Sequence, residues 1–140
     1  MHLYAFERLD VWQVSRAFVK EVYRLLAQFP DFEMYNLTNQ IRRAAVSVSL
    51  NIAEGTSRNS LKEQSRFSEV AYGSLLEVHC SLLIAKDLGY IDGNDLSGIS
   101  VRIQELSNKL NALKQSQIRR SEIQQQTNKQ INKTNKQINN

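Results

Sequence analysis

SLKEQSRFSEVAYGSLLEVHCSLLIAKDLG, residues 60–89, is the stretch with the clearest signal for a fold in this sequence. Ser60 and Glu63 have the spacing of a capping box, in which each side chain accepts a hydrogen bond from the backbone N–H of the other residue. Gly89 has the position of the residue that commonly follows a helix end. Between these ends, apolar residues recur at helical spacing and predict one long helix with a buried face. We expect that face to comprise Phe67, Val70, Ala71, Leu75, Val78, Leu82, Ala85 and Leu88.

The same periodicity on either side of this stretch predicts three further helices. The first covers about residues 6–29 and stops before the only proline. The second begins after Asn36, a residue type that favours helix caps, and ends at Gly55. The fourth opens at Asp92 or Asn94 and has an apolar seam spaced by three and four residues, as in a coiled coil. This seam comprises Leu96, Ile99, Ile103, Leu106, Leu110 and Leu113.

The chain divides into a bundle and a tail. Four helices with short connections pack as antiparallel neighbours, so residues 1–117 are predicted to form an all-α, up-down antiparallel four-helix bundle. Residues 118–140 are a low-complexity segment rich in Gln, Asn and Lys, in which TNKQINK (127–133) is followed by TNKQINN (134–140). One isoleucine per repeat buries too little surface to offset the entropy of ordering. We therefore expect this C-terminal tail to be disordered.

Charge is unevenly distributed along the chain. Residues 1–113 carry 12 basic and 13 acidic side chains, whereas residues 114–140 carry six basic side chains and one acidic side chain. The basic character therefore belongs to the tail rather than to the bundle. The N-terminus lacks the pattern of a signal peptide, and no stretch approaches the roughly 18 apolar residues of a membrane span. With Cys80 as its single cysteine, the chain is expected to be soluble and cytoplasmic, with no membrane partner.

Few residues are suited to catalysis. The only histidines are His2, near the N-terminus, and His79. A di-iron bundle needs Glu-x-x-His pairs on two helices, and the sequence has none. His79 and Cys80 are adjacent, so on a helix their side chains point about 100° apart and do not form a nucleophile–base pair. We predict a protein that is not an enzyme and that uses no cofactor or metal.

Two of the predicted helices have more apolar surface than a single bundle needs. On a helical wheel of about 100° per residue, a second apolar face lies away from the main stripe of each helix. Each large apolar side chain left in water forgoes roughly 1.5–3 kcal/mol of burial, so these faces predict an oligomer interface. They comprise Val46, Leu50 and Ala53 on the second helix, and Tyr72, Leu76 and Leu83 on the third.

A polar stripe lies between the two apolar faces of the second helix. Its members, at spacings of three and four residues, are Gln40, Arg43, Ser47, Asn51 and Glu54, and Glu77 of the third helix is expected to face them. Such a stripe is either a solvated surface or a hydrogen-bonded network that fixes the register of the helices. Mixed charges in a partly buried setting favour the network over a ligand site, because paired charges tolerate burial better than isolated ones.

Basic side chains in the bundle provide candidate contacts to nucleic acid. Arg42 and Arg43 are neighbours on the second helix, with Arg42 expected to point away from the core. Arg58, Lys62 and Arg66 gather around the start of the third helix, where the positive end of the helix also attracts anions. A solvated helix end accounts for this cluster equally well.

Several segments resemble one bacterial family, the 23S rRNA-intervening-sequence proteins, also called S23-like proteins. The matching segments are LDVWQ (9–13), VYRL (22–25), FPDFEMYNLTNQIRRAAVSVSLNIAEG (29–55) and RFSEVAYGSLLEV (66–78). The resemblance covers about residues 6–113. Asn36 stands where the family commonly has glycine, and Ser49 where it frequently has proline, so a kink expected at that position is weaker here.

The resemblance implies a bundle that assembles into a homopentameric ring. The family is also similar to the basic accessory protein of diversity-generating retroelements, which binds nucleic acid. Our hypothesis is therefore an oligomeric accessory protein that binds RNA or DNA. The alternative is an oligomeric scaffold that binds a partner protein and has no role with nucleic acid.

Overall fold

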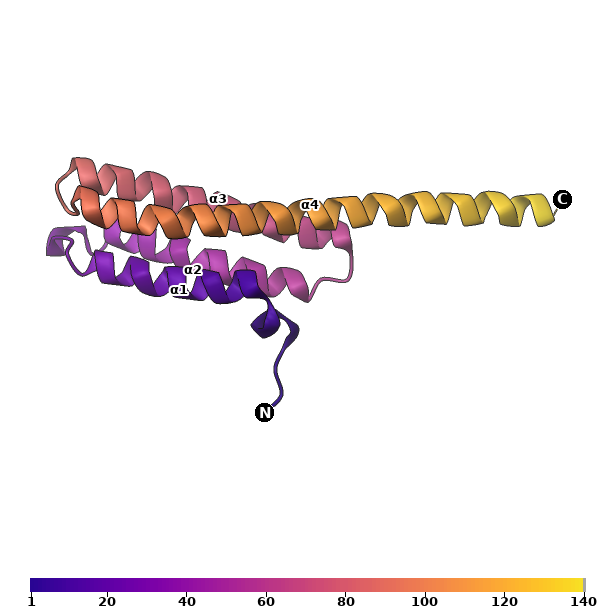
Figure 1. Cartoon of the computed structure of the whole chain (residues 1–140), viewed down its shortest axis with the longest axis horizontal. Coiled ribbons are helices and arrows are strands. Elements are labelled where there is room, and N and C mark those ends of the chain that lie inside the picture. The colour runs from indigo at the N-terminus through magenta and orange to yellow at the C-terminus, as the bar shows by residue number, and fades with distance from the viewer. Residues whose placement is uncertain (140) are drawn as a thin grey trace.

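The computed structural model describes residues 1–139 of the chain, and all of the regular secondary structure within them is helical. The elements are η1 (Ala5–Arg8), α1 (Asp10–Leu26), η2 (Asp31–Glu33), α2 (Leu37–Thr56), α3 (Leu61–Asp87) and α4 (Gly93–Ile138). Each helix from α1 to α4 packs against the next, and α4 also packs against α1 (Figure 1). The prediction of an all-α fold with four main helices is confirmed.

The ends of α3 and the start of α4 follow from local chemistry. Ser60 Oγ accepts a hydrogen bond from the backbone N–H of Glu63 at 3.1 Å, which caps the start of α3. Gly89, with φ of 79°, ends α3 in a Schellman motif, because its N–H donates to the Lys86 carbonyl and the N–H of Tyr90 donates to the Ala85 carbonyl. Asp92 and Asp95 then form a reciprocal capping box that opens α4.

The cap of α2 differs from the prediction. Asn36 makes no side-chain capping bond, and the Glu33 carboxylate instead accepts a hydrogen bond from the backbone N–H of Leu37 at 3.0 Å. Glu33 also accepts a hydrogen bond from the Tyr90 hydroxyl at 3.2 Å, which ties η2 to the connection between α3 and α4. Burial and this hydrogen bond both raise the pKa of Tyr90.

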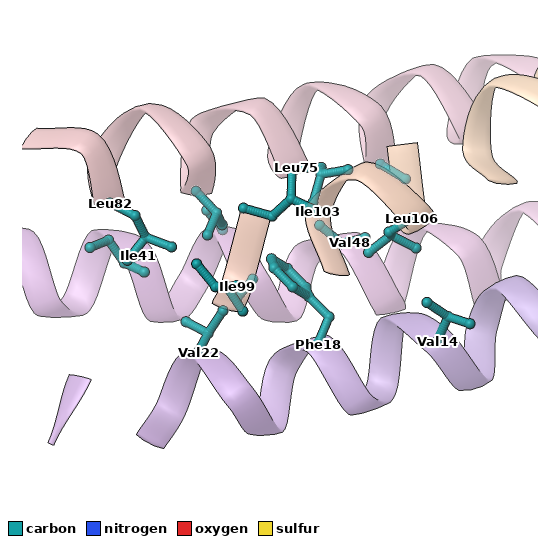
Figure 2. Packing of buried hydrophobic residues seen from close by; sticks show 14 of the residues in the cluster. Val14, Phe18, Val22, Ile41, Val48, Leu75, Leu82, Ile99, Ile103 and Leu106 are labelled. Carbon is teal, nitrogen blue, oxygen red and sulfur yellow. The ribbon is translucent and has the colours of Figure 1, made fainter. Parts of the chain in front are cut away.

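The core is a continuous cluster to which all four long helices contribute (Figure 2). Phe18 of α1, Val48 of α2, and Leu75 and Leu106 of α3 and α4 are fully buried in it. Buried alanines, such as Ala71, allow the helix backbones to approach closely. Two residues of the predicted buried face of α3, Val70 and Leu88, are instead exposed, because they lie on the flank of the helix rather than on its core side.

Two ion pairs join α4 to α1. The Arg102 guanidinium lies 2.9 Å from the Glu21 carboxylate and also binds Glu105 at 3.0 Å, while Lys109 binds Asp10. The hydrogen bond to Glu21 and its negative charge raise the pKa of Arg102, and Asp10 raises the pKa of Lys109 in the same way. These exposed and half-exposed pairs orient α4 along α1, and the apolar core supplies most of the stability.

The prediction of a disordered tail over 118–140 is not what the structure shows. α4 continues to Ile138 and projects well beyond the other three helices (Figure 1). No glycine or proline follows Gly98, so nothing in the sequence stops the helix. Every side chain from residue 122 to residue 139 is exposed, and Asn140 lies outside the described residues. Among the described helices, none has an apolar stretch of the length that a membrane span requires.

We predict that Leu106→Ala lowers the free energy of unfolding by about 2–5 kcal/mol, because it leaves a cavity at a fully buried position of α4. Val101→Ala is the matched control in the same helix, since Val101 is 72% exposed, and it should change stability by less than about 0.5 kcal/mol. Urea denaturation followed by circular dichroism measures both. Equal effects of the two substitutions would contradict this account of the core.

Candidate functional site

The polar stripe of α2 faces α3 and forms hydrogen bonds with it. Ser47 Oγ lies 2.9 Å from Ser74 Oγ, and the Asn51 amide donates to the Ser47 carbonyl at 2.8 Å and to its hydroxyl at 3.0 Å. Gln40 donates to the Glu77 carboxylate at 3.4 Å. Ser74 was not among the predicted members of the stripe, because no sequence pattern marks a serine on a helix surface as a hydrogen-bond partner of another helix.

Two members of the predicted stripe lie outside this network. Glu54 pairs with Arg58, 3.6 Å away, on the exposed side of the α2 end. Arg43 is exposed and has no ion pair within residues 1–139. The stripe therefore links α2 to α3 at its centre and is open to solvent at its edges.

An open groove lies over the same stripe, with a volume of about 850 Å³. Its walls include Gln40, Arg43 and Ser47 from α2, and Ser74, Glu77 and Ile84 from α3. The groove also borders Glu33, so its lining combines the Arg43 cation with two carboxylates, hydrogen-bonded amides and serines, and an exposed isoleucine.

The predicted apolar faces are two separate patches. Val46, Leu50 and Ala53, here called the α2 patch, lie on the outer side of α2, with Leu50 55% exposed. Tyr72, Leu76 and Leu83, here called the α3 patch, lie toward α4. Glu69, about two turns before Leu76 on the same side of α3, indicates this direction, because Glu69 pairs with Lys114 of α4 at 3.9 Å. Leu76 and Leu83 are exposed, whereas Tyr72 packs partly against the core.

The predicted basic residues form two groups, at opposite ends of α2. Arg42 is half-buried and donates to the Asn39 side chain at 3.1 Å, beside Arg43 near the start of α2. Arg58 follows the end of α2, about 20 Å farther along the helix axis at a rise of about 1.5 Å per residue. Its guanidinium lies 4.6 Å from the centre of the Phe67 ring. Lys62 and Arg66 are exposed near it at the start of α3.

Further basic residues lie at the end of the bundle that carries Arg58. Arg120 of α4 shares a small surface hollow with Thr56 of α2 and Gln64 of α3. α4 is anchored there by buried Gln117, whose side-chain oxygen accepts a hydrogen bond from Ser68 at 2.7 Å. The extension of α4 then carries Arg119, Lys129, Lys133 and Lys136. The sequence showed these charges, but only a continuous helix places Arg120 beside Thr56 and Gln64 and carries the lysines outward along the part of α4 that projects beyond the bundle (Figure 1).

The remaining reactive side chains are scattered. Cys80 is exposed and His79 is half-buried, both on α3, and His2 is exposed near the N-terminus. Across residues 1–139, no group of three or more His, Cys, Asp or Glu side chains is arranged to hold a metal ion. The other surface features are the groove, the two apolar patches and the basic end.

The fold defines a helical-bundle protein, and sequence comparison identifies the family. The profile of the 23S rRNA-intervening sequence proteins matches residues 7–112, so the chain belongs to that family, as predicted. A structure of a protein of unknown function from the S23 ribosomal protein family of Bacteroides thetaiotaomicron has the same fold. The two share 19% identity at a TM-score of 0.69, over 74% of this chain and 97% of that chain. Comparison with curated proteins gave no match.

We predict that the serine contact between α2 and α3 stabilises the bundle modestly. In a double-mutant cycle of Ser47→Ala and Ser74→Ala, the coupling energy should be about 0.5–1.5 kcal/mol, because each single change removes the same hydrogen bond. Thermal or urea unfolding of the two single variants and the double variant gives this value. Strict additivity would show that the serines contribute nothing to the contact between the helices.

Proposed function

We propose that the protein is a non-enzymatic oligomer that associates with RNA or DNA. The observation that carries this proposal is the gathering of basic side chains at one end of the molecule. Arg58, Lys62 and Arg66 lie around the start of α3, and Arg120 of α4 borders the same end of the bundle. The lysines of the α4 extension continue outward from this end (Figure 1). Over residues 118–139 the extension carries five basic side chains and one acidic one, Glu122.

The α4 extension presents its lysines on one side. Lys129, Lys133 and Lys136 are spaced by four and three residues, so they lie within about 60° of one another around the helix. This row supports electrostatic contact with a phosphate backbone. No aromatic residue occurs in residues 118–139 to stack on a base, so we expect binding without sequence preference and with strong dependence on salt.

Oligomerisation is the second part of the proposal. Leu50 of the α2 patch and Leu76 and Leu83 of the α3 patch are exposed in the single chain, whereas Ala53 borders η1. The α2 patch and the α3 patch face different directions, which suits a heterologous contact, the α2 patch of one copy against the α3 patch of the next. Heterologous contacts close into a ring where the rotation between neighbouring copies divides a full turn, and the family resemblance favours a ring of five subunits. A ring multiplies the basic ends and strengthens binding through multivalency.

The proposal also places the protein in the cytoplasm. RNA and DNA are available there, and the exposed thiol of Cys80 stays reduced.

The nucleic-acid part is tested by filter binding of RNA and of double-stranded DNA over a salt series. We expect Lys129→Gln/Lys133→Gln/Lys136→Gln to weaken retention at least tenfold at low salt and to flatten the salt dependence, since fewer counterions are released. The matched control, Lys20→Gln/Arg24→Gln/Lys86→Gln, removes the same charge from exposed positions away from the basic end and should have little effect. If the wild-type protein retains no nucleic acid at low salt, the proposal fails and the protein-binding scaffold is favoured.

The oligomer is tested by light scattering. Leu50→Glu or Leu76→Glu should yield a smaller particle, because each places a charge in a patch that another copy covers. Val101→Glu, at a more exposed position of α4, should leave the mass of the particle unchanged. A wild-type protein that is monomeric at high concentration would contradict the assignment, as would an unchanged mass in both leucine variants.

A further inference from the structure

The extension of α4 carries an apolar stripe that its own chain leaves uncovered. Its members are Ile123, Thr127, Ile131, Thr134 and Ile138, at spacings of four, four, three and four residues. At about 100° per residue these five side chains fall within about 80° around the helix. Ile123 is 57% exposed, Ile131 51% and Ile138 75%. No other helix of the described chain reaches this part of α4 (Figure 1).

The two threonines belong to the apolar face because their hydroxyls are already satisfied. Thr127 Oγ1 donates to the Ile123 carbonyl at 3.0 Å, and Thr134 Oγ1 donates to the Gln130 carbonyl at 3.1 Å. Their methyl groups remain as the contact surface. Covering the stripe with another helix would therefore leave no hydroxyl without a partner, which is the usual penalty for burying threonine.

The charges of the extension stand away from this stripe. Lys129, Lys133 and Lys136 lie on the opposite side of the helix, and the positions that flank the stripe between residues 124 and 138 are Asn and Gln. Two copies of the extension can therefore approach along the stripe without placing like charges against each other. A partner that recognised the lysines would bind the other side.

The composition of the segment also favours a partner helix. Asn, Thr and Ile are weaker helix formers than Ala or Leu, and a single solvated helix of this length is marginal in water. The unit TNKQIN is identical at 127–132 and at 134–139, so every copy presents the same residues at the same heptad positions. Within the stripe, Thr127 and Ile131 recur seven residues later as Thr134 and Ile138, with the alternating spacing of four and three residues that a coiled-coil seam has.

We propose that residues 123–138 of α4 pair with the same residues of a second copy as a short coiled coil. The isoleucines and threonine methyl groups form the contact, and the lysines of both copies face outward. This contact is separate from the α2 and α3 patches and does not depend on them. It goes beyond the proposed function, although outward lysines are compatible with it.

The experiment measures the distance between spin labels on two copies of the full-length chain. Cys80→Ser removes the native thiol, and Asn128→Cys places a label on the extension, off the stripe. Paired helices have axes roughly 8–10 Å apart, so dipolar electron paramagnetic resonance should show label distances below about 30 Å. Ile131→Lys/Ile138→Lys should abolish this short-distance population. Because both isoleucines are exposed and outside the bundle, the variant keeps the fold and its melting temperature.

The matched control is Gln125→Lys/Asn132→Lys, which adds the same charge on the lysine side and should retain the short distances. Absence of short distances in the wild-type background would overturn the proposal. Short distances that persist in the isoleucine variant would also overturn it, because the bundles alone would then bring the extensions together. Neither result tests the α2 and α3 patches, because the effect of their variants is measured as the mass of the particle.

Discussion

The burial of α4 against the other helices is the constraint on which the rest of the molecule depends. Leu106 and Leu110 close the core, and the Gln117–Ser68 hydrogen bond fixes α4 to α3 at the point where it leaves the bundle. Because no helix breaker follows, the direction set inside the bundle is continued outside it. One helix therefore does two things: it completes a small core, and it carries a row of lysines away from it.

This arrangement separates stability from association. The core is apolar and shared by all four helices, so it needs none of the exposed features. The α2 and α3 patches, the groove over the serine contact and the basic end remain available for other molecules. The proposed association with RNA or DNA uses the basic end, and the proposed ring uses the patches.

Much of the fold follows from the sequence, because helix periodicity and end signals are local. The Ser60 cap, the Schellman motif at Gly89 and the seam from Ile99 to Leu110 are recognisable from residue types alone. Whether a side chain faces the core or solvent depends on how the helices pack, which the local sequence does not determine. Val70 and Leu88 fit a helical stripe yet lie on its exposed flank. Ser74 pairs with Ser47 because of how two helices pack, which no spacing within one helix reveals.

The C-terminal segment from residue 118 likewise shows that local composition does not determine the structure of a segment attached to a folded bundle. Its composition indicated disorder, but a helix that the bundle has already nucleated and anchored needs only to propagate, which costs far less than starting a new helix.

The most direct test of the central claim, association with RNA or DNA through the basic end, is ultraviolet cross-linking in cells, followed by peptide mapping. Nucleic acid should be attached to peptides from residues 114–139 and from the connection between α2 and α3. Cross-links confined to the opposite end of the bundle, or no cross-links at all, would contradict the account.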